Sequence, residues 1–197
     1  MDWRPLIGDL IASKSAIFEV DQGLIFRYAL PKVRATPTDI EGAERRLRRR
    51  LEAAYREFLH AANGIPAMIA NDDLFGTVDL GQGRWRQATE YMSWLRRSSP
   101  EFPAGELVMP IGMAEGAPSL IMLGSGDDPS KVTWFYSGSL ADEWPDLASF
   151  FRGAVEMNRQ TLKSLLMGPL KDELEALRRL APSKRALRKP TAGRPGR

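Results

Sequence analysis

The side chains that most often carry out catalysis are scarce in this sequence. Among its 197 residues there is one histidine, His60, and there is no cysteine. Thiolate nucleophiles, disulfides and Cys- or His-rich metal sites are therefore excluded. We expect His60 on the polar side of a helix near its C-terminal end, where a favourable interaction with the helix dipole explains its position without catalysis.

Pairs of acidic residues and short glycine loops are the other groups that could carry chemistry. The acidic pairs at 72–73, 127–128 and 142–143 lack the alternating ligand spacing of a calcium loop. The glycines at 81–83 and 124–126 lack the remaining residues of a dinucleotide or phosphate loop. We therefore predict no metal, no cofactor and no enzyme activity.

Charge is distributed unevenly along the chain. The sequence has 28 basic and 25 acidic residues and a pI near 9.3, but residues 183–197 carry six basic residues and no acid. We predict that this segment is a disordered tail that adds nothing to stability, because it has too little apolar surface to offset its ordering entropy. Residues 63–150 carry 12 acids against 5 basic residues, so the middle of the chain is acidic.

Two segments in the first third give local signals. Residues 17–20 and 24–28 read as strands of a hairpin around Gly23. Apolar residues then recur every three or four positions from 38 to 62, which predicts one long helix that begins at a capping box of Thr38 and Glu41 and ends at Asn63-Gly64. Pairs spaced i,i+4, Glu44 with Arg48 among them, should neutralise much of its arginine run.

The remaining pattern predicts a sheet between helices. We expect a strand at 67–70, a turn at 71–73 leading into 74–80, a helix at 85–97, antiparallel strands at 106–113, 119–123 and 131–137, and helices at 147–167 and 170–180. This order predicts an α+β fold, a central mainly antiparallel sheet flanked by N- and C-terminal helices, in one domain over residues 1–182. The start of the chain has no signal-peptide pattern and no apolar run is long enough to span a membrane, so we expect a cytoplasmic protein.

Residues 38–155 resemble the SUKH superfamily, which includes yeast cell-wall synthesis regulators and bacterial toxin-immunity proteins. The motifs that carry the resemblance are Tyr55-x-x-Phe58-Leu59 before Asn63-Gly64, then Leu74-Phe75-Gly76, Pro110-Ile111-Gly112, Val132-Thr133-Trp134-Phe135 and Ala148-Ser149-Phe150. The chain reads Leu51-Glu52 where members usually carry Leu-Pro, and Gly153-Ala154 where they carry a second apolar pair. The resemblance implies a SUKH-like fold that acts by binding another protein.

The resemblance and the acidic middle of the chain together predict a partner. An immunity protein blocks the active site of a cognate toxin, and a nuclease toxin presents a basic surface that acids can occupy by charge complementarity. Acids and tryptophans are the candidate partner-binding residues: Asp72, Asp73, Glu115, Asp127, Asp128, Trp134, Asp142, Glu143 and Trp144.

Two other functions remain open at this stage. The arginine run at 45–50 and the basic tail could bind nucleic acid, although that is less favoured because local acids pair with the arginines. A regulatory scaffold like the yeast members is the third hypothesis. We expect the arginines on a helix far from the acidic loops, and the sequence leaves the identity of the toxin and the oligomeric state open.

Overall fold

The computed structural model describes residues 1–103, 108–116, 118–125 and 128–180. Asp127, the start of the strand expected at 106–113 and the basic tail at 183–197 lie outside the described residues. The helices are α1 (Arg4–Asp21), α2 (Pro37–Leu47), α3 (Ala53–Ala61), α4 (Gly83–Ser98), α5 (Leu147–Met167) and α6 (Pro169–Leu180). The strands are β1 (Ile65–Ile69), β2 (Asp72–Leu74), β3 (Met109–Ala114), β4 (Ser119–Ser125), β5 (Asp128–Tyr136) and β6 (Ser139–Trp144).

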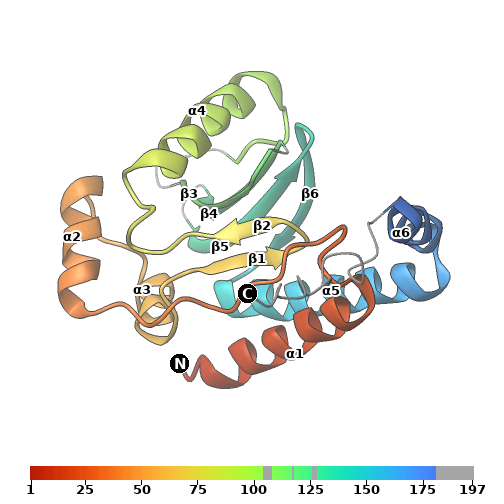
Figure 1. Cartoon of the computed structure of the whole chain (residues 1–197). Coiled ribbons are helices and arrows are strands. Elements are labelled where there is room, and N and C mark those ends of the chain that lie inside the picture. Colours follow the sequence, from red (N-terminus) through yellow and green to blue (C-terminus); the bar gives the residue numbers. More distant parts are fainter. Residues whose placement is uncertain (104–107, 117, 126–127, 181–197) are drawn as a thin grey trace, which may run out of the picture.

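The six described strands form one antiparallel sheet in the order of the chain, from β1 at one edge to β6 at the other. Helix α4 lies on one side of this sheet, while α1 and α5 lie on the other and α2 and α3 stand at one end (Figure 1). The predicted α+β class, with a central antiparallel sheet between flanking helices, is confirmed. None of the described helices is long and apolar enough to cross a membrane.

The hairpin predicted at 17–28 is wrong, because residues 4–21 form helix α1. Its buried positions are Leu10, Lys14, Ile17 and Asp21, which follow helical spacing although two of them are charged. The carboxylate of Asp21 ends the helix by accepting hydrogen bonds from the backbone N–H groups of Ile25 and Phe26, both at 2.9 Å. Residues 24–28 follow as an irregular connector.

The long helix predicted at 38–62 is two helices. Helix α2 begins two residues earlier than expected, in a capping box formed by Thr36 and Asp39 instead of Thr38 and Glu41. It ends where Arg48 takes a left-handed conformation, with φ of 54°. Glu44 then accepts a hydrogen bond from the backbone N–H of Leu51 at 3.1 Å, and Glu52 caps α3. These acids therefore hold the turn instead of making the predicted i,i+4 pairs.

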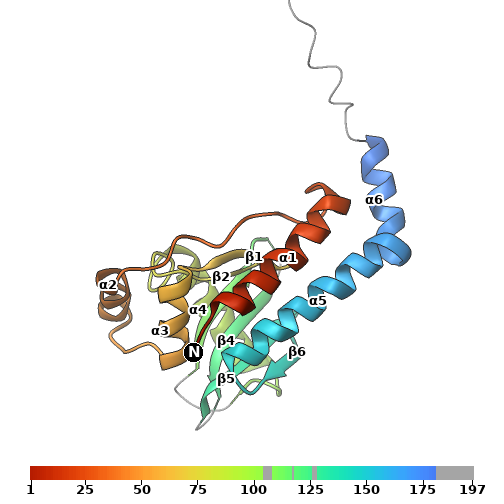
Figure 2. The same cartoon turned by 90° about the horizontal axis from the view of Figure 1, so that it is seen from below.

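Aromatic rings join the helical elements into one core. Phe58 of α3 is fully buried, with its ring centroid 5.8 Å from that of Trp3 and 5.3 Å from that of Phe151 in α5. Helices α1 and α5 run side by side, and α6 extends away from the sheet (Figure 2). A second, smaller cluster of buried side chains joins those three helices, formed by Ile17, Leu165 and Leu174.

Candidate functional site

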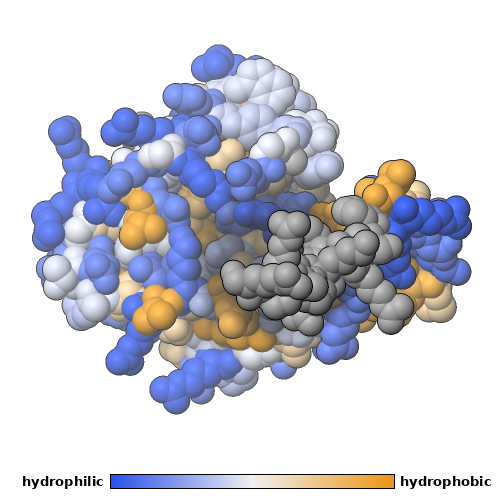
Figure 3. Space-filling view, viewed as in Figure 1, coloured by the Kyte–Doolittle hydropathy of each residue, from blue (hydrophilic) through white to orange (hydrophobic). Residues whose placement is uncertain are grey.

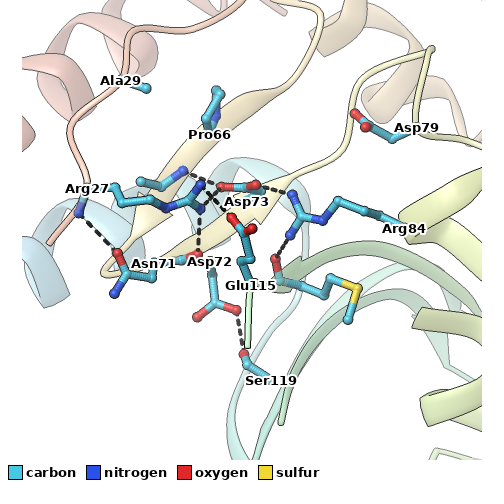
Figure 4. Close-up of polar contacts among 12 residues, drawn as sticks. Arg27, Ala29, Pro66, Asn71, Asp72, Asp73, Asp79, Arg84, Glu115 and Ser119 are labelled. Atoms are coloured by element: carbon cyan, nitrogen blue, oxygen red, sulfur yellow. Dashed lines mark hydrogen bonds and ion pairs between the residues drawn. The ribbon is translucent and has the colours of Figure 1, made fainter. Parts of the chain in front are cut away.

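Asp73 of β2 lies at the centre of a polar cluster beside the β1–β2 hairpin (Figure 4). One carboxylate oxygen accepts a hydrogen bond from Arg27 at 2.7 Å, and the other binds the guanidinium of Arg84. The aspartate side chain is 11% exposed, while the side chains of Arg27 and Arg84 are 44% and 31% exposed. Two arginines from distant segments thus meet on one nearly buried carboxylate.

A bulge in β1 supplies a further ligand to Asp73. The five residues of β1 face only three residues of β2, and Ala67 within the bulge has a φ of 47°, a conformation that is strained for a residue with a side chain. Its backbone N–H donates a hydrogen bond to the Asp73 carboxylate at 2.6 Å. The carboxylate therefore stabilises the strained conformation, because it accepts a hydrogen bond from a buried N–H group that no longer pairs with the neighbouring strand.

Lys14 ties helix α1 to the same bulge. Its ammonium group donates hydrogen bonds to the carbonyl oxygens of Ala29 at 2.6 Å and Pro66 at 2.7 Å. Burial lowers the pKa of Lys14 to about 8, and the nearby negative charge of Asp73 opposes that shift. Lys14 is thus a buried cation that holds three separate segments together.

Arg27 closes the cluster on the connector after α1. Besides Asp73, its guanidinium contacts Glu115 at 3.1 Å and the backbone carbonyl of Asn71 at 3.1 Å. The backbone N–H of Arg27 also donates to the side-chain oxygen of Asn71 at 3.0 Å. Residue 27 is thereby fixed to the turn between β1 and β2.

Arg84, in the first turn of α4, lies between the cluster and an open hollow. Its guanidinium also donates a hydrogen bond to the carbonyl of Met113 at 2.8 Å. The hollow has a volume of about 560 Å³ and is lined by Arg84, Gln87, Met113, Ala114, Glu115 and Gly116. Arg84 and Glu115 therefore line this hollow, but each is already in an ion pair, Arg84 with Asp73 and Glu115 with Arg27.

Asp72 belongs to a separate polar chain, because consecutive side chains of a strand point to opposite faces of the sheet. It is 3% exposed and accepts a hydrogen bond from the hydroxyl of Ser119, which in turn accepts one from the Trp134 indole N–H at 2.8 Å. Burial raises the pKa of Asp72 to about 6 even though the Ser119 hydrogen bond favours the ionised form. Asp72 therefore titrates closer to neutral pH than an ordinary aspartate.

These contacts suit a structural clamp better than a reaction centre. Both oxygens of Asp73 are occupied by arginine, and Asp72 is enclosed by Ser119 and the sheet. Among the described residues, His, Asp and Glu side chains form no group of three that could hold a metal ion. The exposed charges nearby are those that remain available to a partner.

The predicted acidic surface divides into two groups. Asp72 and Asp73 were expected in an exposed turn, but both are buried in β2, and Glu115 is paired with Arg27. Asp72 and Asp73 are unsuited as partner-binding acids because they are buried, whereas the side chain of Glu115 stays 72% exposed although it is paired with Arg27.

The second group of acids lies on the two strands of the β5–β6 hairpin. Asp128, Asp142 and Glu143 are exposed, and Glu143 forms an ion pair with Lys131 at 2.8 Å. Hydrogen bonds from the side chain and backbone of Ser130 lower the pKa of Asp128. The hairpin keeps a negative charge, since residues 128–146 contain four acids and one lysine.

Trp134 and Trp144 are packed within the fold. Trp144 lies with its ring centroid 5.0 Å from that of Phe150, and a Cβ atom on Gly153 would lie 2.4 Å from the indole nitrogen. The glycine, which departs from the SUKH pattern, thus permits the close approach of Trp144 to α5. Trp134 donates its N–H within the sheet, so neither tryptophan is a free anchor for a partner.

The arginine run at 45–50 is distributed differently from the prediction. Arg45 does make the i,i+4 pair that its spacing predicts, with Glu41 at 3.9 Å. Arg46 instead binds the carbonyls of Thr77 and Leu80 in the loop before α4. Arg48 and Arg50 are exposed in the turn between α2 and α3. This turn is not far from the acidic segment: a hollow of about 330 Å³ is lined by Arg49, Arg50, Leu51, Glu52, Ala53, Met109, Leu123 and Pro129, the residue after Asp128.

Sequence reasoning missed the cations of the cluster. Lys14 gave a usable signal, since it stands at helical spacing between the apolar residues Leu10 and Ile17. Arg27 and Arg84 are ordinary basic residues in the sequence, and only the folded chain brings them to Asp73.

Comparisons with known proteins do not assign a family. No family model matches the chain, and no curated protein matches it. The resemblance to the SUKH superfamily therefore stays a prediction.

Proposed function

We propose that this chain is a non-catalytic protein-binding domain that neutralises a basic toxin protein, in the manner of the SUKH immunity proteins. The observation that carries the proposal is the acidic outer edge of the sheet. Asp142 and Glu143 are exposed on β6, which is the last strand of the described sheet. A basic active-site surface would be attracted to this edge and covered by it.

The form of the edge favours contact through side chains over the addition of another strand. Trp134 pairs with Asp142 but Phe135 pairs with Leu140, so Ala141 is an extra residue that forms a bulge in β6. Bulges and charged side chains are the devices by which proteins discourage strand pairing at an exposed edge. The backbone N–H of Leu140 is moreover bonded to the Glu101 carboxylate at 2.9 Å.

The break between α2 and α3 also supports the SUKH resemblance. Members usually carry Leu-Pro where this chain has Leu51-Glu52. A proline is compatible with the start of a helix but not with its interior. Here Glu52 caps the start of α3, so a new helix begins at the position where the family carries proline.

The experiment is to purify the product of the adjacent reading frame, measure its binding to the full chain by calorimetry, and assay its toxin activity with increasing amounts of the chain. The proposal predicts a saturable complex and loss of toxin activity at a fixed stoichiometry. Binding without inhibition would support a scaffold, and the absence of binding would contradict the immunity proposal.

Nucleic-acid binding is a second candidate because Arg48 and Arg50 are exposed at the turn between α2 and α3. Arginine contacts to phosphates would make the affinity for DNA or RNA fall steeply with salt. Replacing both arginines by glutamine should abolish retention on DNA if this candidate is correct. Unchanged retention would contradict it.

A further inference from the structure

Trp94 differs from the other four tryptophans in being exposed. It lies on α4 with 47% of its surface accessible, whereas Trp3 is buried and Trp85, Trp134 and Trp144 are half-buried. The face of the molecule in Figure 3 is mostly hydrophilic, with hydrophobic residues in small separate patches. The Trp94 ring is therefore a large, mainly apolar surface that is open to a partner.

Neighbouring residues hold the Trp94 ring in place. Tyr91 stacks on it with ring centroids 5.5 Å apart and an interplanar angle of 10°. The hydroxyl of Tyr91 donates a hydrogen bond to the backbone carbonyl of Pro118 at 3.2 Å, which fixes the stack to the turn between β3 and β4. An ordered aromatic pair loses little conformational entropy when a partner covers it.

The aromatic pair adjoins the acidic edge. Gly138, at the tip of the β5–β6 hairpin, has a φ of 88°, and a Cβ atom on it would lie 3.4 Å from the Trp94 indole. Strand β6 begins at the next residue and carries Asp142 and Glu143. A single partner surface can therefore reach the rings and the acids together.

We infer that the Trp94–Tyr91 pair is the apolar anchor of the partner-binding surface, and that the partner is a basic protein which places an apolar side chain on Trp94. This inference rests on the proposed function and adds the residue that should dominate its affinity. Tryptophan and tyrosine are enriched among the few interface residues that dominate binding affinity. The polar contacts around such residues contribute less to the affinity. Charge complementarity to Asp142 and Glu143 selects the basic partner.

The test compares Trp94→Ala with Phe18→Ala in binding to the purified product of the adjacent reading frame. Phe18 is a matched control, because it is 42% exposed and stacks on Tyr28 at 4.8 Å, on helix α1 at the other side of the sheet. We expect Trp94→Ala to raise the Kd about 30-fold or more and Phe18→Ala to change it less than about 3-fold. Denaturant midpoints of both variants check that they are folded.

Acrylamide quenching of tryptophan fluorescence measures directly whether a partner covers Trp94 in the wild-type protein. Complex formation should protect the wild-type fluorescence from quenching, and Trp94→Phe should remove most of that protection. Equal affinity of wild type and Trp94→Ala, or unchanged quenching, would overturn the anchor while leaving the proposed function in place. A product that does not bind the wild-type chain would overturn the proposed function and the anchor with it.

Discussion

The carboxylate of Asp73 binds the guanidinium of Arg84, and this ion pair connects β2 to the first turn of α4. The other carboxylate oxygen binds Arg27, so helix α4, the connector after α1 and the β1–β2 hairpin all depend on one acid. Breaking a shielded ion pair by removing one partner leaves an uncompensated charge, which is more damaging than losing the pair as a whole.

Asp73→Asn should lower the free energy of unfolding by about 2 to 4 kcal/mol, less than for a fully buried pair because both arginines are partly exposed. Glu115→Gln, which removes the other carboxylate on Arg27, is the control and should change it by under about 0.5 kcal/mol. Urea unfolding at neutral pH measures both. Equal effects would mean that Asp73 is not the centre of the cluster.

Asp72 should make stability depend on pH between about 4 and 6. Its pKa in the folded protein is raised to about 6 from the ordinary value of 3.8. The folded state therefore binds more protons in this window, and the contribution of Asp72 to stability falls as the pH rises, by roughly 2 to 3 kcal/mol over the whole window. Asp72→Asn should remove that slope.

The measurement is urea unfolding of wild type and Asp72→Asn at pH 4 and pH 7. We expect the variant to gain stability relative to wild type on going from the lower to the higher pH. A difference between the two proteins that stays constant with pH would contradict the burial of an acid with a raised pKa.

Phe58→Ala should cost about 3 to 5 kcal/mol, because it opens a cavity between Trp3, Tyr55 and Phe151. Phe18→Ala, at an exposed aromatic position, should cost under about 1 kcal/mol. Thermal or chemical denaturation distinguishes the two. Similar losses would show that the core does not centre on the rings of Trp3, α3 and α5.

Much of the fold could be predicted from local patterns. Helices α4, α5 and α6 and the meander of β3, β4 and β5 follow from apolar periodicity and from breakers such as Gly168 and Pro169. Helix α1 could not, because Lys14 and Asp21 occupy two of its four buried positions and interrupt the apolar pattern. The break at Arg48 has no glycine or proline to mark it and is held by the later Leu51–Glu44 hydrogen bond.

The candidate site was predictable only in part. The exposed acids of the β5–β6 hairpin were found from charge alone, but the burial of Asp72 and Asp73 follows from their place in a central strand. Arg27 and Arg84 have no local signal, because they pair with Asp73 across 46 and 11 residues of sequence. Which one of the five tryptophans is exposed is likewise set by the tertiary fold.

The most direct test of the account is the association rate with the purified product of the adjacent reading frame, measured by stopped flow at low and high salt. Asp142→Asn with Glu143→Gln is compared with a matched control, Glu19→Gln with Glu173→Gln, which removes two exposed acids from α1 and α6. We expect the β6 variant to associate about 10-fold more slowly at low salt and to lose most of its salt dependence, while the control behaves as wild type. Equal rates for the two variants, at both salt concentrations, would contradict an acidic sheet edge as the partner-binding surface.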